Sequence, residues 1–211
     1  FVAPHLAQHP LSRELYINGV GFYPQARHHS MTRAEHEDNL LLYCSGGHGE
    51  VQAHGQRFAV TRGDLVLLPQ GLPHQYAADD QDPWSIHWVH FTGSQASAFV
   101  DHLAFPVGTC VVPVGPHPKL IVDFDALLSV RKTGYRLNAF IHASQVLKQS
   151  LTYLAMLSTS RVRQTGHFLA ATAAEDVDLE VEGADKISWF QSSPEARRGF
   201  CSICGSGLFW K

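Results

Sequence analysis

Two cysteines near the end of the chain have the spacing of a metal-binding or redox pair. Cys201 and Cys204 form a C-x-x-C motif with Gly199 before it and Gly205 after it. Such a turn holds two thiolates on one side of a tight knuckle, which suits tetrahedral zinc. A structural zinc site has four ligands, so this pair supplies half of one. Four alternatives stay open: free thiols, a disulfide, a zinc site completed by His167 or a second chain, and a partly unfolded tail.

Histidines earlier in the chain do not form a second metal motif. The run Gly63–His74 predicts a turn into a buried strand, a turn out of it, and His74 at the start of the next strand. His28, His29 and His36 precede this run, but no H-x-H pair is followed by a glutamate at a suitable distance. A catalytic zinc needs about three protein ligands. We therefore expect no metal-dependent enzyme site here.

Aromatic and histidine side chains alternate along two predicted strands. In residues 84–91, alternation places Trp84, Trp88 and His90 on one face. His74 and Tyr76 share a face in the same way. A barrel core with satisfied histidines and a pocket for a small molecule are both consistent with this pattern.

The elements that must position these side chains are short strands. From Leu15 to about residue 112, apolar runs alternate with glycine, proline and aspartate turns, a pattern typical of a β-sandwich or barrel. The predicted strands are Leu15–Phe22, Leu40–Tyr43, Glu50–Ala53, Arg57–Val60, Leu65–Leu68 and Ser85–Phe91. Residues 158–165 mark a predicted domain boundary. Beyond this boundary, strand patterns return at Phe168–Ala173, Val177–Val181 and Ile187–Phe190.

Two helices are predicted between these strand regions, at Lys119–Val130 and Leu137–Leu157. The second helix carries a stripe at alternating steps of three and four, the spacing of a helix packed along another helix. The stripe consists of Leu137, Phe140, Ser144, Leu147, Leu151 and Leu154. It predicts either a helix that covers one opening of the barrel or a dimer interface.

Composition limits the function classes. The 211 residues are 45% hydrophobic and carry 16 basic and 19 acidic side chains, so the basic excess of a free-standing nucleic-acid binder is absent. No apolar run approaches the ~20 residues of a membrane span, and we expect a cytoplasmic protein. The predicted division is an arm at 1–13, a barrel at 14–115, a helical dimerisation region at 116–162 and an acidic tail at 165–211. Cys44 and Cys110 are predicted to be buried small hydrophobes.

The strand motifs resemble a known family. Leu40–Gly49, Gly63–His74 and Pro83–Gly93 follow in order with compatible spacing, and Ala78 stands where the second cupin signature has asparagine. Residues 15–160 are similar to the N-terminal effector-binding domain of AraC-type bacterial transcription regulators. The resemblance implies a cupin-like β-barrel followed by two helices, a small effector, often a sugar, inside the barrel, and a homodimer through Leu137–Leu157.

The resemblance also implies roles for individual residues. Trp88 matches a position that stacks on the sugar ring, and Tyr76 one that supplies a hydroxyl. Arg33 is placed like an arginine that clamps the ligand. His74 and His90 are further ligand-binding candidates on the same two strand faces. In the family, the arm before the barrel folds over the bound ligand.

The chain departs from this family after the helices. AraC-type regulators continue for about a hundred residues with two helix-turn-helix motifs, whereas only 47 acidic, strand-like residues follow here. We therefore expect no direct DNA binding by this chain.

Residues Gly166–Trp210 resemble the C-terminal third of the glutathione-dependent formaldehyde-activating enzymes, which are related to centromere protein V. That resemblance implies a short β, zinc-ribbon-like tail in which Cys201 and Cys204 belong to a structural zinc site. The other cysteine ligands of that family are absent. The leading hypothesis is thus a sensor that is not an enzyme. The alternatives are an incomplete zinc-dependent carbon–sulfur lyase and a metal-dependent cupin enzyme.

Overall fold

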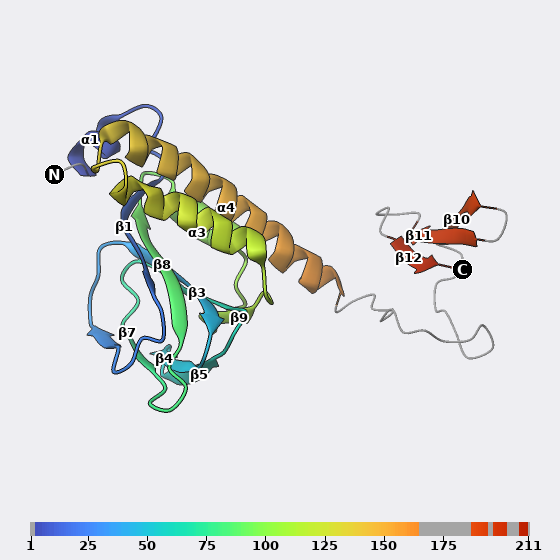
Figure 1. The fold of residues 1–211 in the computed structure, drawn as a ribbon, viewed down its shortest axis with the longest axis horizontal. Helices are drawn as coiled ribbons and strands as arrows, with labels where there is room; N and C mark the ends of the chain where they lie inside the picture. The colour runs from blue at the N-terminus through green and yellow to red at the C-terminus, as the bar shows by residue number, and fades with distance from the viewer. Residues whose placement is uncertain (1–2, 165–186, 194–195, 202–206, 211) are drawn as a thin grey trace. The chain divides into compact units, whose positions relative to one another are not determined.

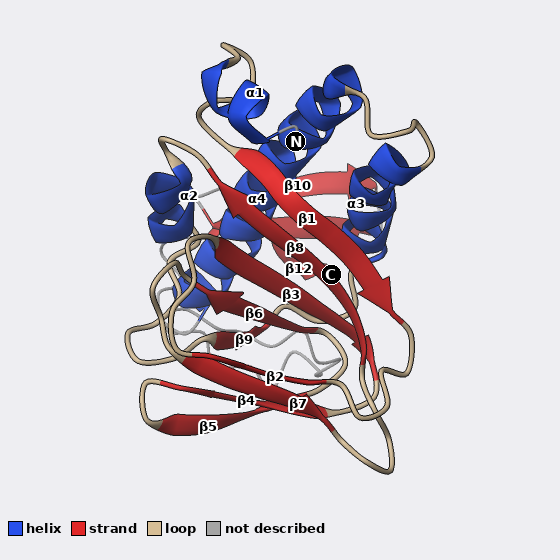
Figure 2. Cartoon of the chain, turned by 90° about the vertical axis from the view of Figure 1, so that its left-hand side faces the viewer, coloured by secondary structure: helices blue, strands red, loops and turns tan. Residues whose placement is uncertain are grey.

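The structure, a computed structural model, describes residues 3–164, 187–193, 196–201 and 207–210. The chain forms two compact units, Phe1–Arg161 and Val162–Lys211. In the first unit, two antiparallel sheets lie face to face, and helices cover the outer side of the larger sheet (Figure 1 and Figure 2). The fold is therefore mainly β with helices, as the strand pattern predicts.

The larger sheet has five strands in the order β1-β8-β3-β6-β9, and each neighbouring pair is antiparallel. Its strands are Tyr16–Tyr23 (β1), Asn39–Gly46 (β3), Asp64–Leu68 (β6), Ser85–Thr92 (β8) and Val111–Pro113 (β9). The smaller sheet has the order β2-β7-β4-β5. Its strands are Ser30–Arg33 (β2), Gly49–Ala53 (β4), Gln56–Val60 (β5) and His74–Ala78 (β7).

Strand β3 shows why the larger sheet lies in the middle of the unit. Leu40, Leu42 and Cys44 pack between the two sheets, whereas Leu41 and Tyr43 pack under the helices. Because successive side chains of a strand point to opposite faces, a continuous apolar run requires cover on both sides. The run from Leu40 to Cys44 meets that requirement.

Among the described residues, four α-helices and one 3-10 turn accompany the sheets. They are Ala3–Gln8 (α1), Ala96–His102 (α2), Pro118–Leu128 (α3), Ser129–Arg131 (η1) and Leu137–Gln164 (α4). Pro118 occupies the first turn of α3, where its missing N–H is not needed for a helical hydrogen bond. Within the part of the chain that the structure describes, no helix combines the length and apolar character needed to cross a bilayer.

The stripe on α4 is buried within the chain from Ser144 to Leu154, whereas Leu137 at the start of the helix is exposed. Leu147, Leu151 and Leu154 pack against α3 and the outer face of the larger sheet, in one cluster with Phe124 and Val89. The spacing correctly predicts that this helix face is buried. The helix covers a sheet face, however, and not an opening of the barrel, and these three leucines are not available to a second chain.

The N-terminal segment differs from the predicted arm without a core. It forms α1, whose Leu6 is buried, and it lies against α4. The Gln145 side-chain amide donates to the carbonyl of Leu11 at 2.6 Å, and Lys148 pairs with Glu14 at 2.9 Å. This segment therefore belongs to the helical layer.

The two lone cysteines are buried small side chains, as predicted. Cys44 and Cys110 both lie in the cluster between the sheets and are free thiols. Burial in apolar surroundings raises the pKa of each thiol to about 11. Neither has the reactivity of an activated thiolate.

The second unit contains a three-stranded antiparallel sheet in the order β10-β11-β12. Its strands are Ile187–Ser193, Ala196–Cys201 and Gly207–Trp210. The first of these confirms the strand predicted at Ile187–Phe190. The strands predicted at Phe168–Ala173 and Val177–Val181 lie outside the described residues.

The six strands predicted in the barrel are confirmed with small changes at their ends. The six predicted strands do not include β2, β7 or β9, although His74 is placed at the start of a strand. Strand β2 has the weakest sequence signal of the three. It has four residues, lies at the edge of its sheet and pairs only with β7, so its sequence lacks a long apolar pattern. This short strand nevertheless carries Arg33.

A glycine on β4 makes room for the buried ring of Trp84, because a Cβ at Gly49 would overlap that indole. We expect Gly49→Ala to lower the free energy of unfolding by about 1–3 kcal/mol through overpacking. Urea unfolding of the purified chain measures the difference. Gly46→Ala is the matched control, since a Cβ there meets nothing within 4 Å. Equal stability of the two variants would contradict the packing described for Trp84.

Candidate functional site

A cavity of about 110 Å³ lies between the two sheets. The larger sheet contributes apolar side chains and Trp88, and the smaller sheet contributes Arg33 and Tyr76. The lining residues are Tyr23, His29, Met31, Arg33, Leu40, Leu42, Tyr76, Ile86, Trp88 and His90. An apolar pocket with a few converging polar groups is typical of small-molecule sites.

Alternation along two strands places these side chains. On β8, Ile86, Trp88 and His90 face the cavity at every second position. At β2, the same period brings Arg33 into line with Met31 and with His29, which directly precedes the strand. Two strands from different sheets thus supply most of the polar lining.

The Trp88 indole lies over two glycines of β1. Gly21 pairs with Trp88 in register, and a Cβ at Gly21 would overlap the indole ring. A Cβ at Gly19 would lie 3.5 Å from the same ring. The sequence Gly-Val-Gly in β1 therefore creates the flat surface on which Trp88 packs.

Rings surround the cavity on several sides. The centroid of Trp88 lies 5.7 Å from that of Tyr23, and His29 lies 5.0 Å from Tyr23 and 5.5 Å from Tyr76. These spacings fall within the range of favourable aromatic contacts. Burial raises the pKa of Tyr76, despite the opposing charge of Arg33, so its hydroxyl keeps its proton.

Arg33 is the cationic group of the lining. The residue is half-buried, and its Nε atom is buried with no hydrogen-bond partner in the protein. Among the described residues, no carboxylate forms an ion pair with it. The guanidinium is thus placed to bind a group that the chain itself does not supply.

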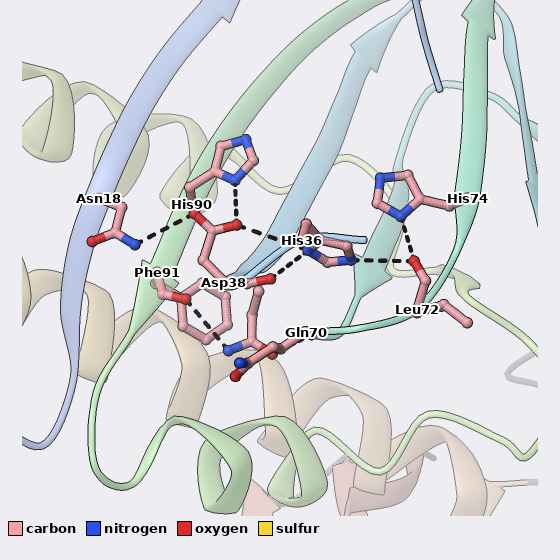
Figure 3. A network of polar contacts seen from close by, with 9 residues as sticks. Asn18, His36, Asp38, Gln70, Leu72, His74, His90 and Phe91 are labelled. Atoms are coloured by element: carbon pink, nitrogen blue, oxygen red, sulfur yellow. Dashed lines mark hydrogen bonds and ion pairs between the residues drawn. The ribbon is translucent and has the colours of Figure 1, made fainter. Parts of the chain in front are cut away.

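A polar network supports the other side of the site (Figure 3). His90 Nδ1 donates to the Asp38 carboxylate at 3.0 Å, and Asn18 donates to the second carboxylate oxygen at 3.4 Å. His36 Nδ1 donates to the main-chain carbonyl of Asp38 at 2.6 Å. Burial opposes ionisation of Asp38, but these histidines and Asn18 outweigh it and lower the pKa of the carboxyl.

His74 does not line the cavity. Its Nδ1 donates to the carbonyl of Leu72 at 2.8 Å (Figure 3). Its ring stacks on Tyr76 with centroids 5.9 Å apart. Burial is the main cause that lowers the pKa of His74, which favours the neutral ring. Of the five predicted ligand-binding residues, Arg33, Tyr76, Trp88 and His90 come together, and His74 lies behind them.

His29 and Tyr23 are lining residues that the sequence-based site omits. His29 has a buried Nδ1 without a partner in the protein, and burial lowers the pKa of its ring. The signal that identifies His29 is its even spacing from Arg33, because residues 29, 31 and 33 share one face. Tyr23 has no comparable signal, since it lies at the end of β1.

The described residues contain no group of three or more histidine, cysteine, aspartate or glutamate side chains that could hold a metal ion. This finding does not cover the predicted half-site in the tail. Cys204 and the side chain of Cys201 are outside the described residues. Zinc binding by this pair stays a prediction.

Comparison with known proteins identifies the family of the chain. A family model described as the AraC-like ligand binding domain matches residues 17–147. The chain belongs to this family. The matched residues include the two sheets, the cavity lining and the start of α4, so the resemblance to the AraC-type domain is confirmed for residues 17–147.

Relatives of the AraC-like domain are regulators of operons. The MmsAB operon regulatory protein of Pseudomonas aeruginosa is 40% identical over 160 residues, which are 74% of this chain and 52% of that protein. The lactose operon transcription activator of Staphylococcus xylosus is 29% identical over 59 residues, 28% of this chain and 21% of that one. The chain thus spans about half, or less, of the length of these relatives.

Among solved structures, a cupin 2 conserved barrel domain protein of Salinispora arenicola is 23% identical. The match covers 36% of this chain and 64% of that one, with a TM-score of 0.29. The resemblance of residues 166–210 to the formaldehyde-activating enzymes stays a prediction.

Asp38 holds the polar network together, and its removal tests that role. We expect Asp38→Asn to lower the free energy of unfolding at pH 7 by about 1–2 kcal/mol, because it weakens the hydrogen bonds of His90 and Asn18. A lowered folded-state pKa contributes stability above the unfolded pKa of about 4, and this contribution disappears as pH falls through the folded value.

Urea unfolding between pH 3 and pH 8 measures this difference. The gap between the chain and Asp38→Asn should be widest near neutrality and should narrow in acid. Asp80→Asn serves as the control, since Asp80 is exposed and makes no hydrogen bond with the described residues. A gap that is unchanged at pH 3 would contradict the network.

Proposed function

We propose that this chain is the effector-sensing part of an AraC-type transcription regulator, and that it binds a small polar molecule between its two sheets. The observation that carries the proposal is the cavity, where Arg33, Tyr76, Trp88 and His90 converge on one apolar space. The named relatives, which regulate operons, support a binding role and not a catalytic one.

A sugar or a sugar-derived molecule is the proposed class of effector. Trp88 and Tyr76 line the same cavity, so one ligand would contact both an aromatic face and a hydroxyl. Aromatic faces suit sugars, because the C–H groups of the ring form an apolar patch beside the hydroxyls. One relative is named for a lactose operon, which supports the same class.

Dimerisation through α4 remains part of the proposal, but on a different face. Leu147, Leu151 and Leu154 are occupied within the chain. A second chain would meet the exposed side of α4, which carries Gln149, Thr152 and Met156.

Ligand-induced stabilisation tests the sensing function. A panel of sugars, polyols and their acids should include compounds that raise the melting temperature, because a ligand that binds the folded state stabilises it. Trp88→Ala should abolish the shift. Tyr135→Ala is the matched control, because Tyr135 is exposed and lies outside the cavity. A panel without any stabilising compound would count against the sensing function.

DNA recognition by these 211 residues is not part of the proposed activity. The acidic balance of residues 165–211 supports this view, since specific DNA contacts require a basic surface. Selection from a pool of random duplexes in about 50 mM salt should enrich no sequence. Enrichment of a defined site would overturn the proposal.

A further inference from the structure

We propose that the effector is a small carboxylate monoanion whose carboxylate binds the guanidinium of Arg33. This inference rests on the proposed sensing function, and it replaces the sugar of that proposal with a small acid. It follows from three properties of the cavity: its hydrogen-bond donors, its charge and its size.

Three buried nitrogen atoms of the cavity lining lack a hydrogen-bond partner in the protein. Nε of Arg33, Nε1 of Trp88 and Nδ1 of His29 are buried and have no partner in the protein. The arginine and tryptophan nitrogens can only donate. Since buried donors almost always have partners, a molecule that binds here must offer oxygen atoms that accept from more than one direction.

The charge of the lining is not balanced within the chain. The lining includes one guanidinium and no aspartate or glutamate. The nearby carboxylate of Asp38 is already engaged by His90 and Asn18. A neutral sugar would leave Arg33 uncompensated, whereas a carboxylate fits the fork of a guanidinium with two parallel hydrogen bonds.

A single negative charge matches this site. Burial lowers the pKa of His29, which favours its neutral ring, so this residue adds no second positive charge. Tyr76 also stays neutral because its pKa is raised. One guanidinium therefore faces one carboxylate.

The size of the cavity limits the rest of the molecule. Its volume of about 110 Å³ is smaller than the ~150 Å³ of an apolar cavity that holds benzene. Since benzene has six non-hydrogen atoms, the enclosed part accommodates roughly four or five, the size of an acid with two or three carbons. Leu40, Leu42 and Ile86 offer an apolar wall to the short carbon chain of such an acid.

Matched pairs of acids and neutral analogues test the inference on the full chain. Propionate, lactate and glycerate are compared with propionamide, lactamide and glycerol, and gluconate with glucose, by thermal unfolding. We expect small acids to raise the melting temperature by about 3–6 °C at ten times their Kd. The neutral analogues should produce no shift, and gluconate should produce less than glycerate.

Variants of Arg33 identify the group that binds the carboxylate. By calorimetric titration with the strongest acid, Arg33→Gln should weaken binding roughly 10- to 100-fold, and Arg33→Lys should lose less because it keeps the charge. Arg57→Gln is the matched control, since Arg57 is exposed and pairs with Glu50 at 3.2 Å. Its affinity should equal that of the unmodified chain.

A separate measurement excludes a merely structural role for Arg33. Without ligand, Arg33→Gln should melt at or above the temperature of the unmodified chain, because the guanidinium has no partner to lose. A lower melting temperature would mean that Arg33 supports the fold, and it would overturn the inference.

The failures of the two proposals are distinguishable. If neutral analogues stabilise the chain as well as the acids do, and Arg33→Gln binds them normally, the anionic class is wrong and the sensing function stands. If no acid and no neutral compound shifts the melting temperature, both proposals fall.

Discussion

The first unit depends on the burial of its larger sheet on both faces. The run Leu40–Cys44 and the apolar positions of β8 place side chains on each side of that sheet. One face requires the smaller sheet and the other requires α3 and α4, because an uncovered apolar face in water is strongly unfavourable. The cavity exists where these two sheets face each other, so the site depends on the same constraint as the core.

The polar groups around the cavity are of two kinds, those with hydrogen-bond partners in the chain and those without. Asp38 is satisfied by His90, Asn18 and His36, which connects the segment before β3 to β1 and β8 of the larger sheet. Arg33 and Trp88 are left without partners. Buried donors without partners destabilise the folded chain. A ligand that accepts hydrogen bonds from these donors removes this cost, and the free energy gained contributes to its affinity. Binding therefore stabilises the conformation that holds the ligand.

Local patterns predict much of this architecture, and their errors are specific. The stripe on α4 correctly indicates a buried helix face, but spacing alone does not distinguish a partner helix in another chain from α3 and a sheet in the same chain. Alternation correctly groups Trp88 with His90. It also groups His74 with Tyr76, yet the His74 ring turns to the carbonyl of Leu72 and away from the cavity.

The sequence by itself determined most of the strands, the two long helices, the family and four of the residues that line the cavity. These features depend on periodicity and on motifs, which are encoded over short stretches of chain. Only the tertiary structure decided that β2 faces β8 across a small cavity and that His29 joins Arg33 there. It also decided that α3 and the larger sheet of the same chain cover the apolar face of α4. Such contacts depend on long-range packing between strands and helices, because a residue pattern specifies which face is buried but not which surface buries it.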